Sequence, residues 1–318
     1  MSTQMVGVPG ARLFVSTHGD GRPLLLINGL GGSHAMWEPL VGRLADFHTI
    51  AFDAPGTGLS PPPAVPPTIP CYAQMIQAMV ARLGHDRVDV LGYSFGGGVA
   101  QELARRAPEM VRRLVLVAAT CGWGGVPAKP GAAAALSTPL RMYSRVYYQA
   151  TALALAGGEI ERDPKFVAYA EALRRRHAPN VGSYFGQLLA LACWSSLPWL
   201  HSLKPPTLVI NGEDDPVVPW ANGALLASEI PEARLHTQRR GGHYLLLDKS
   251  SSVMSAIADF LAADDHRSAN AWCDAITVSR TDAYRAAARS LNTAQPHGAM
   301  SAIFRALCEL NRPPEVAA

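Results

Sequence analysis

The sequence predicts an α/β fold with a doubly wound, mostly parallel sheet. Two observations support this: short apolar, β-prone runs alternate with helical stretches, and each run leads into Gly, Asp or Ser. Parallel strands that feed loops at one edge of a sheet are expected to end in this way. In chain order, the predicted strands span residues 24–28, 49–52, 88–91, 114–117 and 207–210, and the predicted helices span residues 71–83, 97–106 and 221–228.

A helical insertion interrupts this alternation between residues 121 and 204. The stretch is rich in Ala, Leu and aromatic residues, and Pro or Gly breaks it at Pro139, Gly157-Gly158, Pro164 and Pro179-Asn180. An insertion of this length between two core strands is typical of a cap subdomain. We therefore predict a core formed by residues 1–120 and 205–263, with a helical cap formed by residues 121–204.

The predicted cap has an apolar, aromatic-rich character. Nine aromatic residues supply apolar surface there, and we expect little that would bind a charged substrate: Trp123, Tyr143, Tyr147, Tyr148, Phe166, Tyr184, Phe185, Trp194 and Trp199. The run Arg174-Arg175-Arg176 is interpreted as a solvated helix face, with contact to an anionic surface as the alternative. The cap is therefore expected to select the substrate.

Residues 264–318 form a predicted helical extension beyond the core. Met300, Ile303, Phe304, Leu307 and Cys308 recur at helical spacing, which predicts an amphipathic helix packed on the body of the protein. The alternative is a contact surface for a second copy of the chain, giving a homo-oligomer. The end of the extension, residues 312–318, is expected to be disordered.

Composition excludes several classes of protein. Hydrophobic residues make up 48% of the 318 residues and charged residues 17%, and the net charge of +3 disfavours a general nucleic-acid binder. The sequence contains no uncharged apolar run of the ~18–20 residues that a transmembrane segment needs, and we expect no secretion signal. The five cysteines and ten histidines are dispersed without metal or redox spacing. We therefore expect a cytoplasmic protein with reduced thiols and no metal site.

A serine at the end of a predicted strand is the leading candidate for chemistry. The segment Gly92-Tyr93-Ser94-Phe95-Gly96 follows the strand at 88–91 and opens a helix. In this context a serine can sit on a strained turn with its hydroxyl exposed, and small neighbours let the turn pack against its own strand and helix. The pattern predicts Ser94 as a nucleophile; the alternative is an ordinary Gly-rich turn.

A serine nucleophile needs a base, and the base needs an orienting acid. In this strand–turn–helix class the chain order is Ser, then Asp or Glu, then His. His243 follows Gly241-Gly242 and is the predicted base. Asp215 follows the strand at 207–210 and is the predicted acid, which places the cap before the strand carrying the acid. Glu213 and Asp214 are the alternatives for this role.

Acyl transfer also needs hydrogen-bond donors for the developing oxyanion. The backbone N–H of Phe95, next to Ser94, and the N–H of Leu30, in the loop Asn28-Gly29-Leu30-Gly31-Gly32, are the predicted donors. That loop lacks both the GxxxxGK[ST] pattern and the third Gly of a dinucleotide fingerprint, so no nucleotide cofactor is expected. Asp53, in the segment 52–60, is interpreted as a carboxylate that stabilises a turn.

Together these segments resemble the α/β-hydrolase superfamily over residues 10 to about 263. The matching features are NGLGG at 28–32, FDAPGTGLS at 52–60, GYSFG at 92–96, GEDDPVVP at 212–219 and GGH at 241–243. The chain is also similar to one branch, the intracellular poly(3-hydroxyalkanoate) depolymerases. That resemblance rests on Asn28-Gly29, where many hydrolases have His-Gly, and on three further segments: 114–120 with 126–130, 157–158 with 162–164, and 184–201.

The resemblance implies an α/β-hydrolase fold and a serine hydrolase that cleaves ester bonds of stored polyester at granule surfaces. The family's triad carries over onto Ser94, Asp215 and His243. Related polyester synthases have Cys at the position of Ser94, which favours hydrolysis, whereas epoxide hydrolases and dehalogenases have Asp there. Family members usually end soon after the last core helix, so the extension at 264–318 is a departure, for which a granule contact is a further alternative.

The sequence thus predicts a serine ester hydrolase that acts on hydrophobic 3-hydroxyacyl polyesters through an acyl-enzyme. A first alternative is another reaction on the same fold: a general carboxylesterase, a C–C hydrolase or a perhydrolase. A second alternative is a ligand-binding sensor that retains the triad and barely turns over its ligand.

Overall fold

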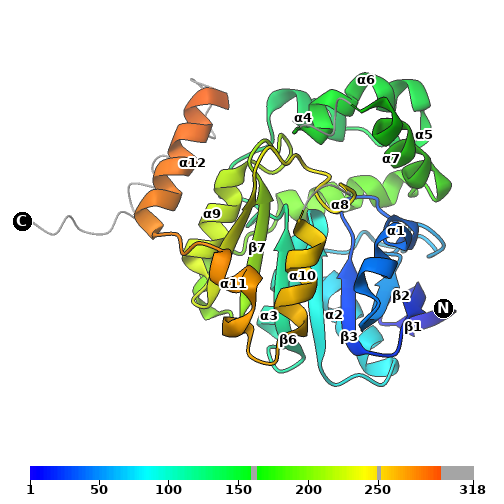
Figure 1. Cartoon of the computed structure of the whole chain (residues 1–318). Coiled ribbons are helices and arrows are strands. Elements are labelled where there is room, and N and C mark those ends of the chain that lie inside the picture. The colour runs from blue at the N-terminus through cyan, green and yellow to red at the C-terminus, as the bar shows by residue number, and fades with distance from the viewer. Residues whose placement is uncertain (159–162, 249–251, 295–318) are drawn as a thin grey trace, which may run out of the picture.

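A computed structural model describes residues 1–158, 163–248 and 252–294 of the chain (Figure 1). An eight-stranded sheet forms its centre, in the order β1-β2-β4-β3-β5-β6-β7-β8. The strands are β1 (Ser2–Val8), β2 (Ala11–His18), β3 (Arg22–Ile27), β4 (Phe47–Phe52), β5 (Val88–Tyr93), β6 (Val111–Val117), β7 (Thr207–Gly212) and β8 (Ala233–Gln238). The strands from β4 to β8 in this order pair in parallel. The predicted α/β fold with a mostly parallel sheet is confirmed.

Helices cover both faces of the sheet, and the strands show why. In β3, Leu25 and Ile27 face one apolar cluster, whereas Leu24 and Leu26 face the other. The first cluster includes α2 (Ile69–Arg82), α3 (Phe95–Arg106) and α9 (Trp220–Glu229). The second includes α1 (Glu38–Val41), α10 (Val253–Ala262) and α11 (Asn270–Asp274). Because both faces are buried, the central strands are continuous apolar runs, which is why they were recognisable in the sequence.

The N-terminal hairpin was not predicted. Strands β1 and β2 pair antiparallel, and β2 also pairs antiparallel with β4. In β1, Val6 and Val8 are buried while the other five residues are exposed. An edge strand with one solvated side shows no continuous apolar run, so the pattern that identifies the central strands does not apply to it.

In the described residues between β6 and β7, the segment predicted as a cap contains five α-helices, followed by the short 3-10 helix η4 (Leu197–Ser202). The α-helices are α4 (Pro130–Leu136), α5 (Leu140–Tyr143), α6 (Arg145–Ala156), α7 (Pro164–Arg176) and α8 (Val181–Ala192). Helix α6 ends before Gly157, which adopts a φ of 62°, and Asn180 caps the start of α8 through its side chain. Figure 1 shows α4 to α7 grouped above one end of the sheet. We propose that residues 121–204, called the cap segment below, act as a cap subdomain.

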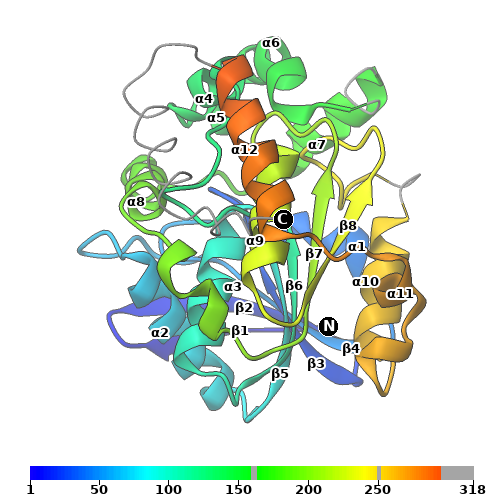
Figure 2. The same cartoon turned by 90° about the vertical axis from the view of Figure 1, so that its left-hand side faces the viewer.

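The C-terminal extension continues along the first face of the molecule. Helix α12 (Arg280–Ala294) packs beside α9 (Figure 2), where Arg280 forms an ion pair with the buried Glu229 over 2.6 Å. The predicted amphipathic helix with Met300, Ile303, Phe304, Leu307 and Cys308 lies outside the described residues, as does the predicted disordered end at 312–318.

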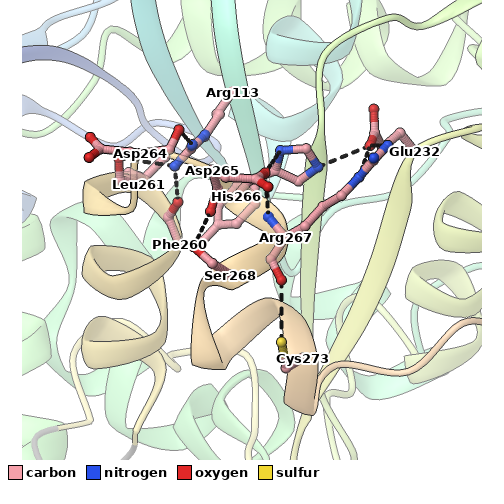
Figure 3. A network of polar contacts seen from close by, with 10 residues as sticks. All are labelled: Arg113, Glu232, Phe260, Leu261, Asp264, Asp265, His266, Arg267, Ser268 and Cys273. Atoms are coloured by element: carbon pink, nitrogen blue, oxygen red, sulfur yellow. Dashed lines mark hydrogen bonds and ion pairs between the residues drawn. The ribbon is translucent and has the colours of Figure 1, made fainter.

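A network of polar contacts fastens the start of the extension to the core (Figure 3). The buried guanidinium of Arg113, from β6, donates to the carbonyl oxygen of Phe260 at the end of α10 and, over 3.0 Å, to that of Asp264. On the neighbouring side, the Glu232 carboxylate accepts from Arg267 over 2.7 Å and lies 3.0 Å from Nε2 of His266. The connection from α10 to α11 is therefore fixed to two points of the core.

Three further features concern membrane insertion, cysteine thiols and metal binding. Among the residues described, none of the helices combines the length and apolar character needed to cross a membrane. Cys71, Cys121, Cys193 and Cys273 are free thiols, and Cys308 falls outside the described ranges. Within those same ranges, no cluster of three or more His, Cys, Asp or Glu side chains could hold a metal ion.

Candidate active site

Ser94 lies on a sharp turn between β5 and α3. Its φ of 54° and ψ of −118° put it in a backbone region that non-Gly residues rarely adopt. The turn has no room for larger neighbours: a Cβ added to Gly96 would lie 2.3 Å from the carbonyl oxygen of Ile27, and one added to Gly92 would lie 2.6 Å from that of Gly96. The close packing and the strained backbone together hold the Ser94 hydroxyl at the carboxyl end of the central strands.

The three residues predicted as nucleophile, base and acid come together at this edge of the sheet. Nε2 of His243 lies 3.2 Å from Oγ of Ser94, and Nδ1 of His243 lies 2.8 Å from Oδ2 of Asp215. His243 is 6% exposed and Asp215 is 1% exposed. In this geometry the imidazole can accept the Ser94 proton on one nitrogen while it donates from the other to the carboxylate.

The structure distinguishes Asp215 from the two alternative acids. The other oxygen of Asp215, Oδ1, accepts hydrogen bonds from the backbone N–H groups of Val217 and Val218, both over 2.8 Å. These bonds fix the carboxylate so that Oδ2 faces His243. Glu213 and Asp214 are exposed on the same loop, and Glu213 accepts a hydrogen bond from the N–H of Arg240 over 3.3 Å. Of the three, Asp215 is the one in contact with His243.

The Gly-rich loop (residues 28–32) lies beside Ser94. A Cβ added to Gly29 would approach the Cβ of Ser94 to 3.3 Å. The Asn28 side chain closes the loop on itself, because it accepts from the N–H of Gly29 over 2.9 Å and donates to the carbonyl oxygen of Ser33 over 2.6 Å. The N–H of Gly31 donates to Oε1 of Gln187 in α8 over 2.8 Å. The loop shape is therefore fixed partly by its own side chain and partly by the cap segment.

The two residues predicted to supply oxyanion donors line the same cavity. Leu30 and Phe95 both contribute to its wall, together with Ser94. Over the described ranges, neither the Leu30 N–H nor the Phe95 N–H donates to a protein acceptor. Both donors can therefore bind a substrate oxygen without first breaking an internal hydrogen bond.

A buried His–Asp pair lies just after the Gly-rich loop in the chain. Asp53 accepts from the backbone N–H of His34 over 2.6 Å, and its Oδ2 lies 2.9 Å from Nδ1 of the same histidine. The Asp53 carboxylate also accepts from the N–H of Leu59 over 2.7 Å, which stabilises the turn at 52–60. Asp53 is completely buried and is not in the wall of the cavity that contains Ser94. Its contacts are those of a turn-stabilising carboxylate.

Two tyrosines next to the predicted triad were not singled out in the sequence. The Tyr93 hydroxyl donates to the backbone carbonyl of His243 over 3.0 Å, and burial raises the pKa of Tyr93 well above its ordinary value, which keeps this donor protonated. Tyr244 lies against the His243 ring, with 5.9 Å between ring centroids. Each tyrosine is the chain neighbour of a predicted triad residue, and that adjacency was the available signal.

A cavity of about 780 Å³ opens above Ser94 and His243. Most of its wall is aliphatic rather than aromatic: Leu30, Met36, Val126, Leu136, Met142, Leu155, Leu188 and Leu191. Of the nine aromatic residues considered in the cap segment, Trp123 lines the cavity, whereas Tyr148 and Tyr184 are buried in packing. Leu291 from α12 also reaches the wall, so the C-terminal extension takes part in shaping the pocket.

The cavity wall corrects two expectations about charge. Arg141 and Arg174 of the cap segment both line it and are 4% and 9% exposed. The cap segment therefore carries groups that could bind an anion, contrary to the expectation of a wall with little for a charged substrate. Arg174 is also not part of a solvated face: Arg175 and Arg176 are exposed, but α7 turns Arg174 inward. Three consecutive arginines on a helix point in three directions, and the sequence alone does not show which of them faces inward.

Comparison with known proteins adds to this geometry. A family model for the alpha/beta hydrolase fold matches residues 22–250. Over 246 residues the chain is 37% identical to the poly(3-hydroxyalkanoate) depolymerase of Ectopseudomonas oleovorans. The matched region covers 77% of this chain and 86% of the depolymerase. Over 252 residues it is 31% identical to the protein named "Putative carbamate hydrolase RutD" of Pseudomonas syringae pv. syringae (strain B728a), covering 77% and 95% of the two chains.

A solved structure has the same fold. The esterase RhEst1 from Rhodococcus sp. ECU1013 superposes with a TM-score of 0.70 and 23% identity, over 83% of this chain and 99% of that chain. The family match spans the strands β3 to β8, the cap segment and all three residues of the predicted triad. The chain therefore belongs to the α/β-hydrolase family.

Proposed function

We propose that this protein is a serine ester hydrolase that cleaves hydrophobic polyesters of 3-hydroxy acids through an acyl-enzyme. The observation that carries the proposal is the series of short contacts from Ser94 through His243 to Asp215 at the floor of a largely aliphatic cavity. The identity of 37% with a poly(3-hydroxyalkanoate) depolymerase supports the choice of substrate.

Acylation is the first half of the proposed reaction. Oγ of Ser94 attacks the ester carbonyl carbon while its proton passes to Nε2 of His243, and the carbonyl oxygen takes up the negative charge. The N–H groups of Leu30 and Phe95 donate to this oxygen. When the tetrahedral intermediate collapses, the bond to the alcohol oxygen breaks, His243 gives its proton to that oxygen, and the acyl group stays on Ser94.

Deacylation repeats these steps with water. His243 takes a proton from a water molecule as its oxygen attacks the acyl carbon, and the Leu30 and Phe95 amides again hold the oxyanion. Collapse breaks the bond to Oγ of Ser94, which regains the proton from His243, and a carboxylic acid leaves. Asp215 stays ionised throughout and stabilises the imidazolium that forms twice.

The cavity favours a bulky, apolar acyl chain. Its volume of about 780 Å³ is within the range of pockets that take drug-sized ligands, and its aliphatic wall favours alkyl side chains. A polyester of 3-hydroxy acids offers such chains next to each ester bond. We propose that the protein acts in the cytoplasm on stored polyester granules, without a metal or nucleotide cofactor.

Covalent labelling is the direct test of the reaction class. A fluorophosphonate probe should label the wild-type protein and should fail to label Ser94→Ala, because the probe reacts with an activated serine. Full turnover of p-nitrophenyl butyrate by Ser94→Ala would contradict the proposal. Labelling without turnover of any ester would favour the sensor alternative, in which a triad is kept but catalysis is not.

The substrate class needs a separate comparison. Polyester granules and short p-nitrophenyl esters should be assayed side by side, and release of soluble 3-hydroxy acids from the granules measured. We expect granule hydrolysis that Ser94→Ala abolishes. Rapid turnover of short esters with no release from granules would contradict the depolymerase assignment and leave a general carboxylesterase.

A further inference from the structure

Arg174 is a buried cation beside the predicted catalytic histidine. Its guanidinium carbon lies 4.3 Å from the ring centroid of Tyr244 and 5.8 Å from that of Tyr148. Tyr244 directly follows His243 in the chain, and the two rings are 5.9 Å apart. The guanidinium and the imidazole thus both lie within 5.9 Å of the centre of the Tyr244 ring, and Arg174 and His243 line the same cavity.

The charge of Arg174 lacks a counterion in the described part of the chain. Its Nη1 atom is buried without a hydrogen-bond partner, and no carboxylate there lies within ion-pair distance of it. The acidic residue nearest in the helix, Glu171, pairs with Arg175 over 3.0 Å. The residues that line the cavity include Arg141, Arg174 and His243 and, among those described, no Asp or Glu.

Burying a cation without a counterion costs free energy, so a buried arginine is expected to have a partner. The faces of two tyrosine rings compensate part of the lost hydration through cation–π contacts. They leave the Nη1 donors without an acceptor, and Arg174 contributes to the wall of the cavity, where an acceptor on a bound ligand could reach the guanidinium. A guanidinium presents parallel donors that match a carboxylate, and the low dielectric of a closed pocket strengthens such a bond.

The position of Arg174 indicates which part of an ester it would meet. The leaving alcohol oxygen must lie next to Nε2 of His243, because His243 protonates it. Arg174 lies on the His243 side of the cavity, over Tyr244, whereas Arg141 reaches toward the Gly-rich loop, where it contacts the carbonyl oxygen of Leu30 over 3.4 Å. Arg174 is therefore placed beside the alcohol portion of the substrate.

We propose that Arg174 binds the carboxylate of a 3-hydroxy acid leaving group, so that the protein cleaves carboxyl-terminated oligoesters in preference to their neutral esters. This inference rests on the proposed ester hydrolysis. In such an oligomer the terminal unit carries a free carboxylate a few bonds from the ester oxygen. Cleavage of that ester bond by water yields the shortened chain as an acid and the terminal 3-hydroxy acid as the alcohol product.

A matched pair of substrates tests the subsite. The linear dimer of 3-hydroxybutyrate and its methyl ester have the same scissile bond and differ in the carboxylate. We expect Arg174→Met to lower kcat/KM for the dimer acid by about 10- to 100-fold, the loss typical of a hydrogen bond to a charged group, and to change that for the methyl ester by less than about threefold. Initial cleavage of the shared ester bond is measured chromatographically, as 3-hydroxybutyrate released from the dimer acid and as methyl 3-hydroxybutyrate released from the methyl ester.

Arg176→Met provides the matched control. Arg176 lies on the same helix, is exposed, and pairs with Glu38 over 2.5 Å, so the substitution should affect neither substrate. Equal losses of Arg174→Met on both substrates would overturn the proposal, because Arg174 would then act by holding Tyr244. Unchanged activity of Arg174→Met on the dimer acid would overturn it as well.

A binding measurement separates this inference from the proposed reaction. Calorimetric titration of the dimer acid into Ser94→Ala needs no turnover, and Arg174→Met in that background should weaken binding about 10-fold or more. If the wild-type protein fails to hydrolyse either dimer while this binding difference is seen, the reaction is wrong and the subsite stands. Equal binding with and without Arg174 would contradict the proposed subsite and leave the proposed reaction unaffected.

Discussion

The side chain of Gln187 in α8 accepts a hydrogen bond through Oε1 from the backbone N–H of Gly31, over 2.8 Å. Gln187 is 1% exposed, and this contact joins the cap segment to the Gly-rich loop that carries the proposed oxyanion donor Leu30. An oxyanion donor works only if its position is fixed before the reaction. We infer that the cap segment helps to hold the loop in its working shape as well as covering the substrate.

Replacing Gln187 should therefore impair turnover. Gln187→Met removes the acceptor but keeps the volume, and it leaves the buried Gly31 N–H unpaired at a cost of about 1–3 kcal/mol. We expect kcat on p-nitrophenyl butyrate to fall by about 5- to 50-fold with a smaller change in KM. Leu189→Ala, exposed on the same helix, is the control and should leave kcat unchanged. An unchanged kcat in Gln187→Met would show that the loop holds its shape by itself.

The three acidic residues of the loop after β7 should differ sharply in their effect on catalysis. Asp215→Asn keeps the shape of the side chain but turns an acceptor of the His243 proton into a group that favours the wrong imidazole tautomer, so kcat should fall by about 1,000- to 10,000-fold. Glu213→Gln and Asp214→Asn are matched controls on the same loop, and both should stay within about threefold of wild type. Steady-state rates on p-nitrophenyl butyrate measure all three. A larger loss in either control than in Asp215→Asn would reassign the acid.

Arg113 should contribute strongly to stability. Its buried guanidinium donates to the carbonyl oxygens of Phe260 and Asp264, which end α10 and start the extension (Figure 3). Arg113→Met leaves these acceptors without their donor, and we expect the free energy of unfolding to fall by about 2–4 kcal/mol. Urea unfolding followed by circular dichroism measures this change.

Arg267→Met is the control for Arg113→Met. Arg267 belongs to the same network but is 69% exposed, and its contact with Glu232 is open to solvent. Exposed ion pairs are screened by water and salt, so the free energy of unfolding should change far less. Comparable destabilisation by the two substitutions would mean that the network acts as one unit.

Much of the fold was predictable because its central strands are buried on both faces. Such strands are apolar throughout, so they stand out from the helices between them. The same rule does not identify the hairpin of β1 and β2, because few residues of these two strands at the edge of the sheet are buried. Ser94 and His243 could be found because the backbone around them must turn sharply, and Gly residues mark those turns in the sequence.

Other parts of the site depend on packing that has no local signal. Asp215 differs from Glu213 and Asp214 in being buried against Val217 and Val218, and all three carboxylates look alike in the sequence. Arg174 is likewise one of three adjacent arginines, and only the orientation of α7 turns it into the cavity. Side-chain direction on a helix follows from which face is covered, and that depends on segments far away in the chain.

The last prediction concerns pH and His236 in β8. Nε2 of His236 is buried without a hydrogen-bond partner, and this burial lowers its pKa from the ordinary value of 6.5, although the Asp274 carboxylate opposes the shift. The unfolded chain therefore binds a proton more readily than the folded protein below pH 6.5. The stabilisation is complete above that pH and is lost as the pH falls through the lowered pKa. Urea unfolding at pH 7.5 and 5.5 should show a smaller loss of stability in His236→Gln than in wild type, and a larger one in Asp274→Asn. Identical losses in all three proteins would contradict this role.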